Sequence, residues 1–136
     1  MEQLIVAAEI CEDVWSPIPA QASGAALEGA TVIVNCSASD ETIGKDVYRR
    51  ELIQGQSARL IAGYIYANAG EGESTTDLVF GGHSIIAENG SILKGGEAIL
   101  QSGNLFGDRC AESHPRTPAE HDISDERGEN ARPCAV

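Results

Sequence analysis

Short apolar runs alternate with polar segments along most of the chain, and this pattern predicts alternating strands and helices. Residues 3–10 are predominantly apolar, which predicts a central strand covered on both faces. Residues 20–29 are rich in alanine and predict a short helix that stops at Gly29. Residues 31–36 are β-branched and predict a second strand. This order, with short connections, predicts two parallel neighbouring strands and a right-handed crossover.

The pattern continues with a polar loop over residues 37–44 and a longer helix over residues 46–60. Gly55 weakens this helix, and one broad face of it carries Tyr48, Leu52, Ile53 and Leu60. Residues 88–90 predict a hairpin turn. Further strands are predicted at residues 63–68, 78–80, 83–87, 92–93 and 98–100. The fold class predicted from these elements is α/β.

The character of the chain changes after Gly107. Beyond this point only Ile123 and Val136 are large and aliphatic, which is too little apolar surface to offset the entropy of ordering. We therefore expect a partial folded domain over residues 1–106 and a polar, disordered tail over residues 107–136.

The charge and the cysteines restrict the function classes. The net charge is −12 and no basic stripe is visible, which argues against nucleic-acid binding and against binding to anionic membranes. No apolar run is long enough to span a membrane, and the chain does not begin with a signal peptide. The four cysteines are widely spaced and form no CxxC pair, so we expect no zinc ribbon and a reducing, cytoplasmic location.

Cys11 is the candidate for chemistry. It follows the first predicted strand directly, and two carboxylates, Glu12 and Asp13, come next. Ligands of open α/β sheets bind at the carboxyl ends of the strands, where a thiol can act as a nucleophile. The alternative is an inert core cysteine. For Cys36, at the end of the second strand, we expect buried packing, and for Trp15 packing in a core or interface.

Three stretches together resemble one family. They are EICEDVW with PIP (residues 9–15 and 17–19), NCSAS (residues 35–39) and YANAGEGESTTDLVF (residues 66–80). They look like the C-terminal half of the glutamine amidohydrolase domain of glutamine-dependent NAD synthetases, a branch of the nitrilase (carbon–nitrogen hydrolase) superfamily.

The resemblance implies part of an αββα sandwich, with a mixed sheet and helices on one face. It also implies a Glu-Lys-Cys triad, in which the cysteine forms a thioester with glutamine and releases ammonia. A separate synthetase domain would use this ammonia and ATP to convert deamido-NAD to NAD. The intact protein would be a homo-oligomer.

The motifs assign roles to four residues by resemblance. Cys11 matches the nucleophile, and Glu12 matches a residue that helps to hold the substrate while its backbone N–H contributes to the oxyanion site. Ser39 matches a glutamine-binding serine. Lys45 falls where the family carries an arginine that contacts the substrate carboxylate, and a lysine keeps the charge but loses the bidentate fork.

Two departures from the family pattern matter. The general-base glutamate and the lysine of the family lie upstream of the cysteine, and no lysine precedes Cys11 in this chain. No glycine-rich ATP loop is visible either, so ATP and Mg would belong to a missing synthetase domain and this chain would hold no cofactor. We therefore expect a gene fragment, inactive alone, whose partners are glutamine and the synthetase domain or the missing N-terminal half.

Two other hypotheses remain open. One is a different nitrilase-branch amidase, against which the GEGESTTD stretch argues. The other is a non-catalytic remnant or interaction subunit that pairs with a complementary half. The GEGESTTD stretch contains Glu71, Glu73, Ser74 and Asp77. The family resemblance favours a role for these residues in the glutamine pocket or in the route to the partner domain. The alternative is a polar loop without such a role. For His83 we expect a satisfied core or edge histidine.

Overall fold

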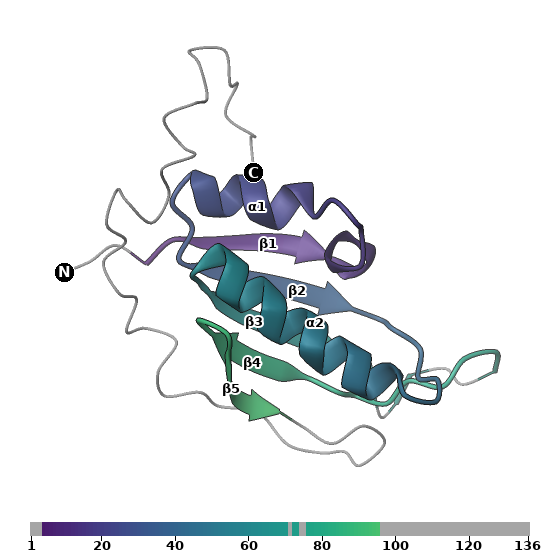
Figure 1. Cartoon of the computed structure of the whole chain (residues 1–136). Helices are drawn as coiled ribbons and strands as arrows, with labels where there is room; N and C mark the ends of the chain where they lie inside the picture. The colour runs from purple at the N-terminus through teal and green to yellow at the C-terminus, as the bar shows by residue number, and fades with distance from the viewer. Residues whose placement is uncertain (1–3, 71, 74–75, 96–136) are drawn as a thin grey trace.

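The computed structural model describes residues 4–70, 72–73 and 76–95, and in this part of the chain two helices lie against a five-stranded mixed sheet (Figure 1). The elements are β1 (Val6–Ile10), the 3₁₀ turn η1 (Cys11–Val14), α1 (Ala20–Leu27), β2 (Val32–Ser37), α2 (Lys45–Leu60), β3 (Gly63–Asn68), β4 (Ile85–Glu88) and β5 (Ser91–Gly95).

The strands lie in the sheet in chain order, β1-β2-β3-β4-β5. β1, β2 and β3 are parallel, as the strand–helix–strand pattern predicts, because α1 and α2 return the chain to the same end of the sheet. β4 and β5 run antiparallel and close the sheet as a hairpin. The carboxyl ends of the three parallel strands therefore meet at one edge of the sheet, which we call the rim.

Turn residues set the boundaries of these elements. α1 ends before Gly29, whose φ of +100° suits a residue without a side chain, and the Ala30 N–H donates to the Ala25 carbonyl. The predicted hairpin is confirmed, with left-handed φ values at Asn89 (46°) and Gly90 (78°). Several bounds differ from the prediction, since β1 begins at Val6, β4 begins at Ile85 and α1 ends at Leu27. Residues 78–80 form no strand and contribute only a bridge between Phe80 and Asp40. The predicted strand at 98–100 and the polar tail lie outside the described residues.

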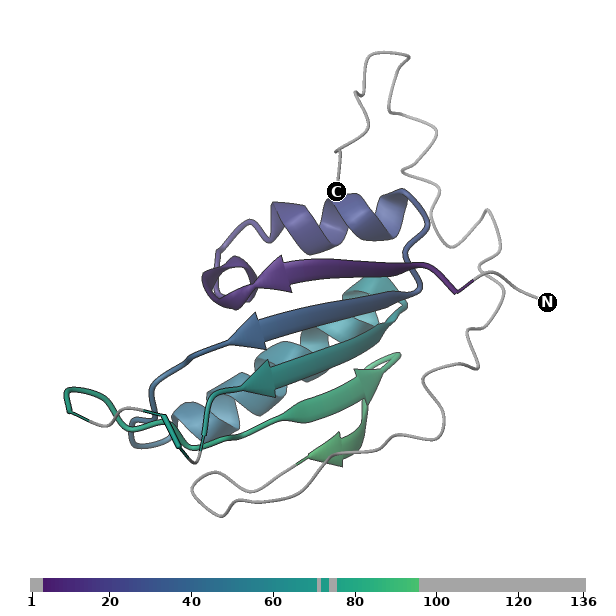
Figure 2. The same cartoon turned by 180° about the vertical axis from the view of Figure 1, so that it is seen from behind.

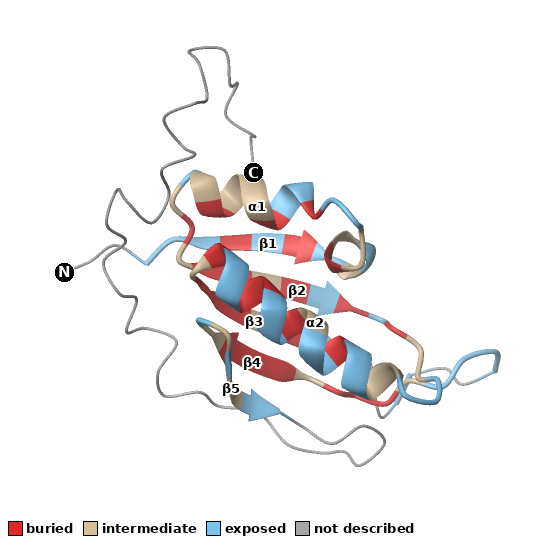
Figure 3. Cartoon of the chain, in the orientation of Figure 1, coloured by how far each residue is buried: buried red, intermediate tan, exposed pale blue. Residues whose placement is uncertain are grey.

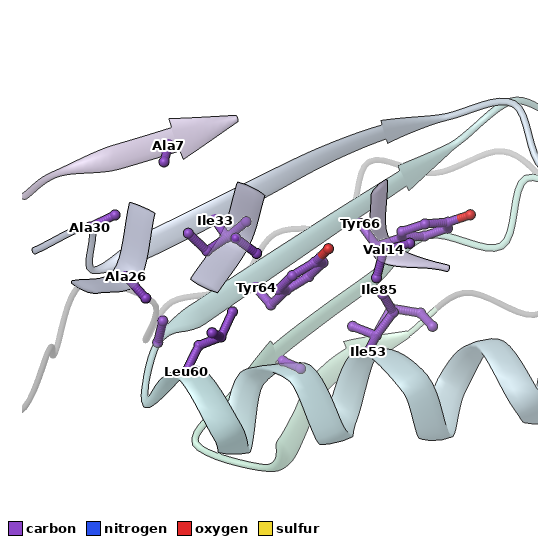
Figure 4. Packing of buried hydrophobic residues seen from close by; sticks show 13 residues of the cluster. Ala7, Val14, Ala26, Ala30, Ile33, Ile53, Leu60, Tyr64, Tyr66 and Ile85 are labelled. Carbon is purple, nitrogen blue, oxygen red and sulfur yellow. The ribbon is translucent and has the colours of Figure 1, made fainter. Parts of the chain in front are cut away.

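One hydrophobic core lies between the sheet and the helices. Ala22 and Ala26 of α1 and Ile53 and Leu60 of α2 contribute to it, and Figure 4 shows these helices facing side chains such as Ile33, Tyr64 and Ile85 of the sheet. The predicted face of α2 is partly wrong, because Arg49 occupies the buried face and Tyr48, one residue earlier, is exposed.

The opposite face of the sheet carries no helix of the described part of the chain (Figure 2). Burial alternates along β1, so that Ala7 is buried whereas Val6 and Ile10 are 53% and 62% exposed (Figure 3). The prediction that both faces of this strand are covered is therefore wrong for the residues described. Cys36 points to the same open face and is exposed, so its predicted burial is also wrong. Apolar residues on both faces are typical of a strand between two layers.

We predict that Gly55→Ala raises the free energy of unfolding by about 0.5–1 kcal/mol, since alanine restricts the unfolded chain and favours a helix. Gly55 lies inside α2, and an added Cβ would meet no atom within 4 Å. The control is Gly44→Ala, where space is equally free but φ is +79°, so that this variant should lose stability. Urea denaturation of both variants measures the change in the free energy of unfolding. A change in the same direction for the two variants would contradict the prediction.

Candidate functional site

Cys11 lies at the rim, directly after β1 and at the start of η1, where it is partly buried. Its φ is 44°, a left-handed conformation that costs a residue with a side chain about 1–3 kcal/mol. Asp13 stabilises the turn, because its carboxylate accepts a hydrogen bond from the Ile10 N–H at 2.8 Å. The buried Val14 anchors the other end of the turn in the core.

The predicted residue Glu12 is exposed on this turn, so its side chain is free to reach a ligand at the rim. Ser39 lies in the loop after β2 and is buried. The side-chain amide of Asn68, at the end of β3, clamps the Ser39 backbone, since Oδ1 accepts from the Ser39 N–H at 2.8 Å and Nδ2 donates to the Ser39 carbonyl at 3.1 Å. The ends of adjacent parallel strands thus fix this loop.

Lys45 is the first residue of α2 and lies beside the end of η1. Its Nζ is 5.4 Å from the centre of the Trp15 ring, and the Trp15 ring packs against Tyr48. The same ammonium donates a hydrogen bond to Asp40, which lowers the pKa of the Asp40 carboxyl. The structure therefore brings Lys45 to the rim with Cys11 and Ser39, but its charge already has a partner.

A buried polar network lies below Cys11, on the helix-covered face of the sheet. Oε1 of Glu9 accepts hydrogen bonds from Asn35 Nδ2 at 3.1 Å and from the Tyr64 hydroxyl. Ser37 Oγ donates to Asn35 Oδ1 at 2.7 Å, and Asn35 Nδ2 lies 3.5 Å from the Cys11 carbonyl. We did not predict this network from the sequence. The sequence feature that could have revealed it is a polar residue at an inward position in each of two apolar strands. These residues are Glu9 and Asn35, which are register partners in β1 and β2.

Burial raises the pKa of Glu9, the Asn35 hydrogen bond opposes this rise and the charge of Asp13 adds to it. The folded protein therefore binds a proton more readily than the unfolded chain at pH values above about 4.5. We predict that the free energy of unfolding falls as pH rises from about 4.5 through the folded-state pKa of Glu9.

The variant Glu9→Gln tests this pH dependence because it keeps the shape and cannot titrate. Its stability relative to the wild-type chain should improve from pH 5 to pH 7.5, as measured by urea denaturation at each pH. A stability difference that stays constant over this range would show that Glu9 does not titrate there.

A second buried cluster joins the loop after β2 to the segment before β4. Arg49 is fully buried and donates from Nη1 to Glu41 Oε2 at 3.0 Å, while the same atom lies 3.1 Å from His83 Nδ1. Burial lowers the pKa of His83 and the Arg49 charge lowers it further, so the ring is neutral and accepts from Arg49. His83 is the satisfied core histidine predicted from the sequence. A Cβ at Gly81 would lie 2.6 Å from Glu41 Oε2, so a larger residue there would force the Glu41 side chain to shift.

The described residues contain no group of three or more His, Cys, Asp or Glu side chains that could hold a metal ion. Among them there is also no helix with the length and apolar character that a membrane crossing requires. Of the residues in the GEGESTTD stretch, Glu71 and Ser74 lie outside the described part, and Glu73 and Asp77 are exposed.

Comparisons with known proteins find relatives that match part of this chain. No family model matches the chain. The glutamine-dependent NAD(+) synthetase of Mycobacterium tuberculosis is 55% identical over 85 residues, which cover 62% of this chain and 12% of that protein. The chain is homologous to part of glutamine-dependent NAD(+) synthetase. It spans about an eighth of the length of this NAD(+) synthetase.

Solved structures agree with this relationship. A glutamine-dependent NAD(+) synthetase from Cytophaga hutchinsonii superimposes with a TM-score of 0.54 at 30% identity, over 66% of this chain and 13% of that one. A mutant amidase of Nesterenkonia from the nitrilase superfamily superimposes with a TM-score of 0.57 at 22% identity, over 70% of this chain and 34% of that one. The mixed sheet with its two helices is thus the fold of the nitrilase superfamily, as the sequence motifs predict.

Proposed function

We propose that this chain supplies the nucleophile and part of the glutamine pocket of a glutamine amidohydrolase that serves NAD synthesis. The observation that supports this most strongly is the position of Cys11, on a left-handed turn at the carboxyl end of β1, in a chain homologous to glutamine-dependent NAD(+) synthetase. A partly exposed thiol at such a rim can reach a small amide substrate.

In the proposed reaction the Cys11 thiolate attacks the side-chain amide carbon of glutamine. The C–S bond forms, the carbonyl oxygen becomes an oxyanion, and the C–N bond then breaks so that ammonia leaves with a proton. Water hydrolyses the resulting thioester to glutamate and restores the thiol. A backbone N–H aimed at the oxyanion typically lowers the barrier by about 3–4 kcal/mol, and the Glu12 N–H is the candidate donor here.

The pocket residues proposed for glutamine are Glu12, Ser39 and Lys45. Ser39 is suited to this because the Asn68 clamp holds its backbone fixed at the rim. Lys45 would bind the substrate carboxylate only by exchanging Asp40 for it, since its ammonium forms an ion pair with Asp40. A lysine in this position acts as a point charge and gives less directional binding than an arginine.

We propose further that the chain is inactive alone. Attack by the thiol requires a base and a positive charge near the oxyanion, and no lysine precedes Cys11 in the sequence. Both groups would come from the part of an NAD(+) synthetase that precedes this segment, while ATP and Mg would act in the synthetase domain. That domain would receive the ammonia.

The test measures glutamate formation from glutamine by the 136-residue chain alone and by the chain co-expressed with the preceding part of a glutamine-dependent NAD(+) synthetase. We expect no turnover by the chain alone and Cys11-dependent turnover by the pair. Robust turnover by the isolated chain would overturn the inactivity. A pair that forms but turns over no glutamine would overturn the proposed function.

The open face of the sheet favours a second candidate function, a non-catalytic subunit that pairs with a complementary half. Its exposed apolar residues, Val6 and Ile10, lie on a strand that is buried on the other side. A sheet face of this kind is stable in water when another layer covers it. Size-exclusion chromatography with light scattering tests whether the chain associates through this face, and a compact, stable monomer would count against this candidate function. The glutaminase assay of the paired protein then decides whether pairing also produces catalysis.

A further inference from the structure

The buried network below Cys11 reaches the backbone of the nucleophile itself. Asn35 is 1% exposed, and its Nδ2 lies 3.1 Å from Glu9 Oε1 and 3.5 Å from the carbonyl oxygen of Cys11. The contact to Cys11 is at the long end of hydrogen-bond distances, which is common for catalytic geometries before a substrate binds. The Asn35 side chain thus links the buried Glu9 to the backbone of the turn.

The orientation of the Asn35 amide is fixed from both ends. Ser37 Oγ donates to its Oδ1 at 2.7 Å, and Glu9 Oε1 accepts from its Nδ2. Tyr64 donates to the same Glu9 oxygen from the third strand, and Figure 4 shows this tyrosine between the sheet and the helices. Rotation of the amide by 180° would place Oδ1, an acceptor, against two other acceptor oxygens, Glu9 Oε1 and the Cys11 carbonyl. The remaining amide hydrogen therefore points at the Cys11 carbonyl.

The geometry of the peptide bond transmits this constraint to the next residue. The Cys11 carbonyl and the Glu12 N–H belong to one planar trans peptide unit, so they point in opposite directions. A carbonyl held inward against Asn35 aims the Glu12 N–H outward from the network. That N–H belongs to the first turn of η1, where backbone donors have no intrahelical acceptor.

We propose that Asn35, oriented by Glu9, Tyr64 and Ser37, is a positioning residue that aims the Glu12 N–H at the developing oxyanion. The inference rests on the proposed glutaminase function and adds the device that keeps the donor in place. Cys11 holds a conformation that costs free energy, and the hydrogen bond from Asn35 stabilises it. A donor fixed before the reaction stabilises the transition state without a cost of reorganisation.

The first experiment needs no catalysis and uses the chain as it is. The carbonyl ¹³C resonance of Cys11 is measured by NMR in the wild-type chain and in three variants. Asn35→Leu removes the donor and Tyr64→Phe removes one support of Glu9, so both should move this resonance upfield. Glu9→Gln keeps an oxygen acceptor for Asn35 and should keep the resonance near its wild-type position.

The matched control is Tyr66→Phe. Tyr66 lies two residues along the same strand and is equally buried, but its hydroxyl has no hydrogen-bond partner among the described residues. This variant deletes the same atom as Tyr64→Phe and should leave the Cys11 resonance unchanged. Equal shifts in the two tyrosine variants, or no shift in Asn35→Leu, would overturn the proposed link.

The second experiment measures glutaminase kinetics of the chain paired with the preceding part of an NAD(+) synthetase. Asn35→Leu and Tyr64→Phe should lower kcat about tenfold and leave KM within about twofold, because the donor acts in the transition state. Glu9→Gln should keep most of the wild-type kcat, because it retains the oxygen acceptor for Asn35, and Tyr66→Phe should match the wild type. If kcat is unchanged while the NMR signal moves, the positioning role is wrong. If the wild-type pair hydrolyses no glutamine, the proposed function fails and the NMR result alone decides the link.

Discussion

Cys11→Ala is expected to lower the kcat for glutamine hydrolysis of the paired protein by about 10³-fold or more. The substitution removes the proposed nucleophile, so the remaining groups of the proposed site could only bind glutamine and polarise its amide. The measurement is the initial rate of glutamate formation at saturating glutamine. The KM of any residual activity should change little, because the thiol contributes to the transition state and not to ground-state binding.

Cys36→Ala is the matched control for this prediction. Cys36 carries the same thiol but lies exposed on the open face of the sheet, one strand away from Cys11. We expect its glutaminase rate to stay within about twofold of the wild type, as for a substitution away from the reacting atoms. A loss of activity in Cys36→Ala equal to that in Cys11→Ala would show that thiols stabilise the paired protein and that neither one is the nucleophile.

The parts of the fold that local signals determine were predictable. The strand over residues 63–68 has the predicted bounds, because β-branched and aromatic residues there stand between turn residues. The hairpin at Asn89 and Gly90 was equally clear, since these residue types adopt left-handed conformations at low cost. The position of Cys11 at the rim was also predictable, because it is the first residue after an apolar strand and precedes a polar turn, which places it at the carboxyl end of that strand.

The misses have one physical origin, which is contact between residues far apart in the chain. Burial of Cys36 was predicted from its own strand, but exposure depends on whether a second layer covers that face. The pairing of Glu9 with Tyr64 joins positions 55 residues apart, and the periodicity of one strand carries no information about it. The local signs of that network were the polar residues Glu9 and Asn35 at inward positions of two apolar strands. The roles of Glu12, Ser39 and Lys45 stay predictions.

The buried cation of α2 gives the largest expected effect on stability. We predict that Arg49→Ala lowers the free energy of unfolding by about 3–5 kcal/mol, because it leaves the carboxylate of Glu41 buried without its counter-charge. Arg49 is fully buried, and it donates to Glu41, to His83 and, at 3.4 Å, to the Asp40 carbonyl. Urea denaturation followed by the fluorescence of Trp15, the single tryptophan, measures the loss.

Arg50→Ala is the matched control, because Arg50 follows directly on the same helix and is exposed. It should change stability by less than about 0.5 kcal/mol. The double variant Glu41→Gln with Arg49→Met should lose less than Arg49→Ala alone, since it removes both charges together. Equal losses in Arg49→Ala and Arg50→Ala would contradict the prediction. The result bears on the site, because Glu41 and Asp40 lie in the loop that presents Ser39. Arg49 holds this loop against the helix together with the ion pair of Lys45 and Asp40.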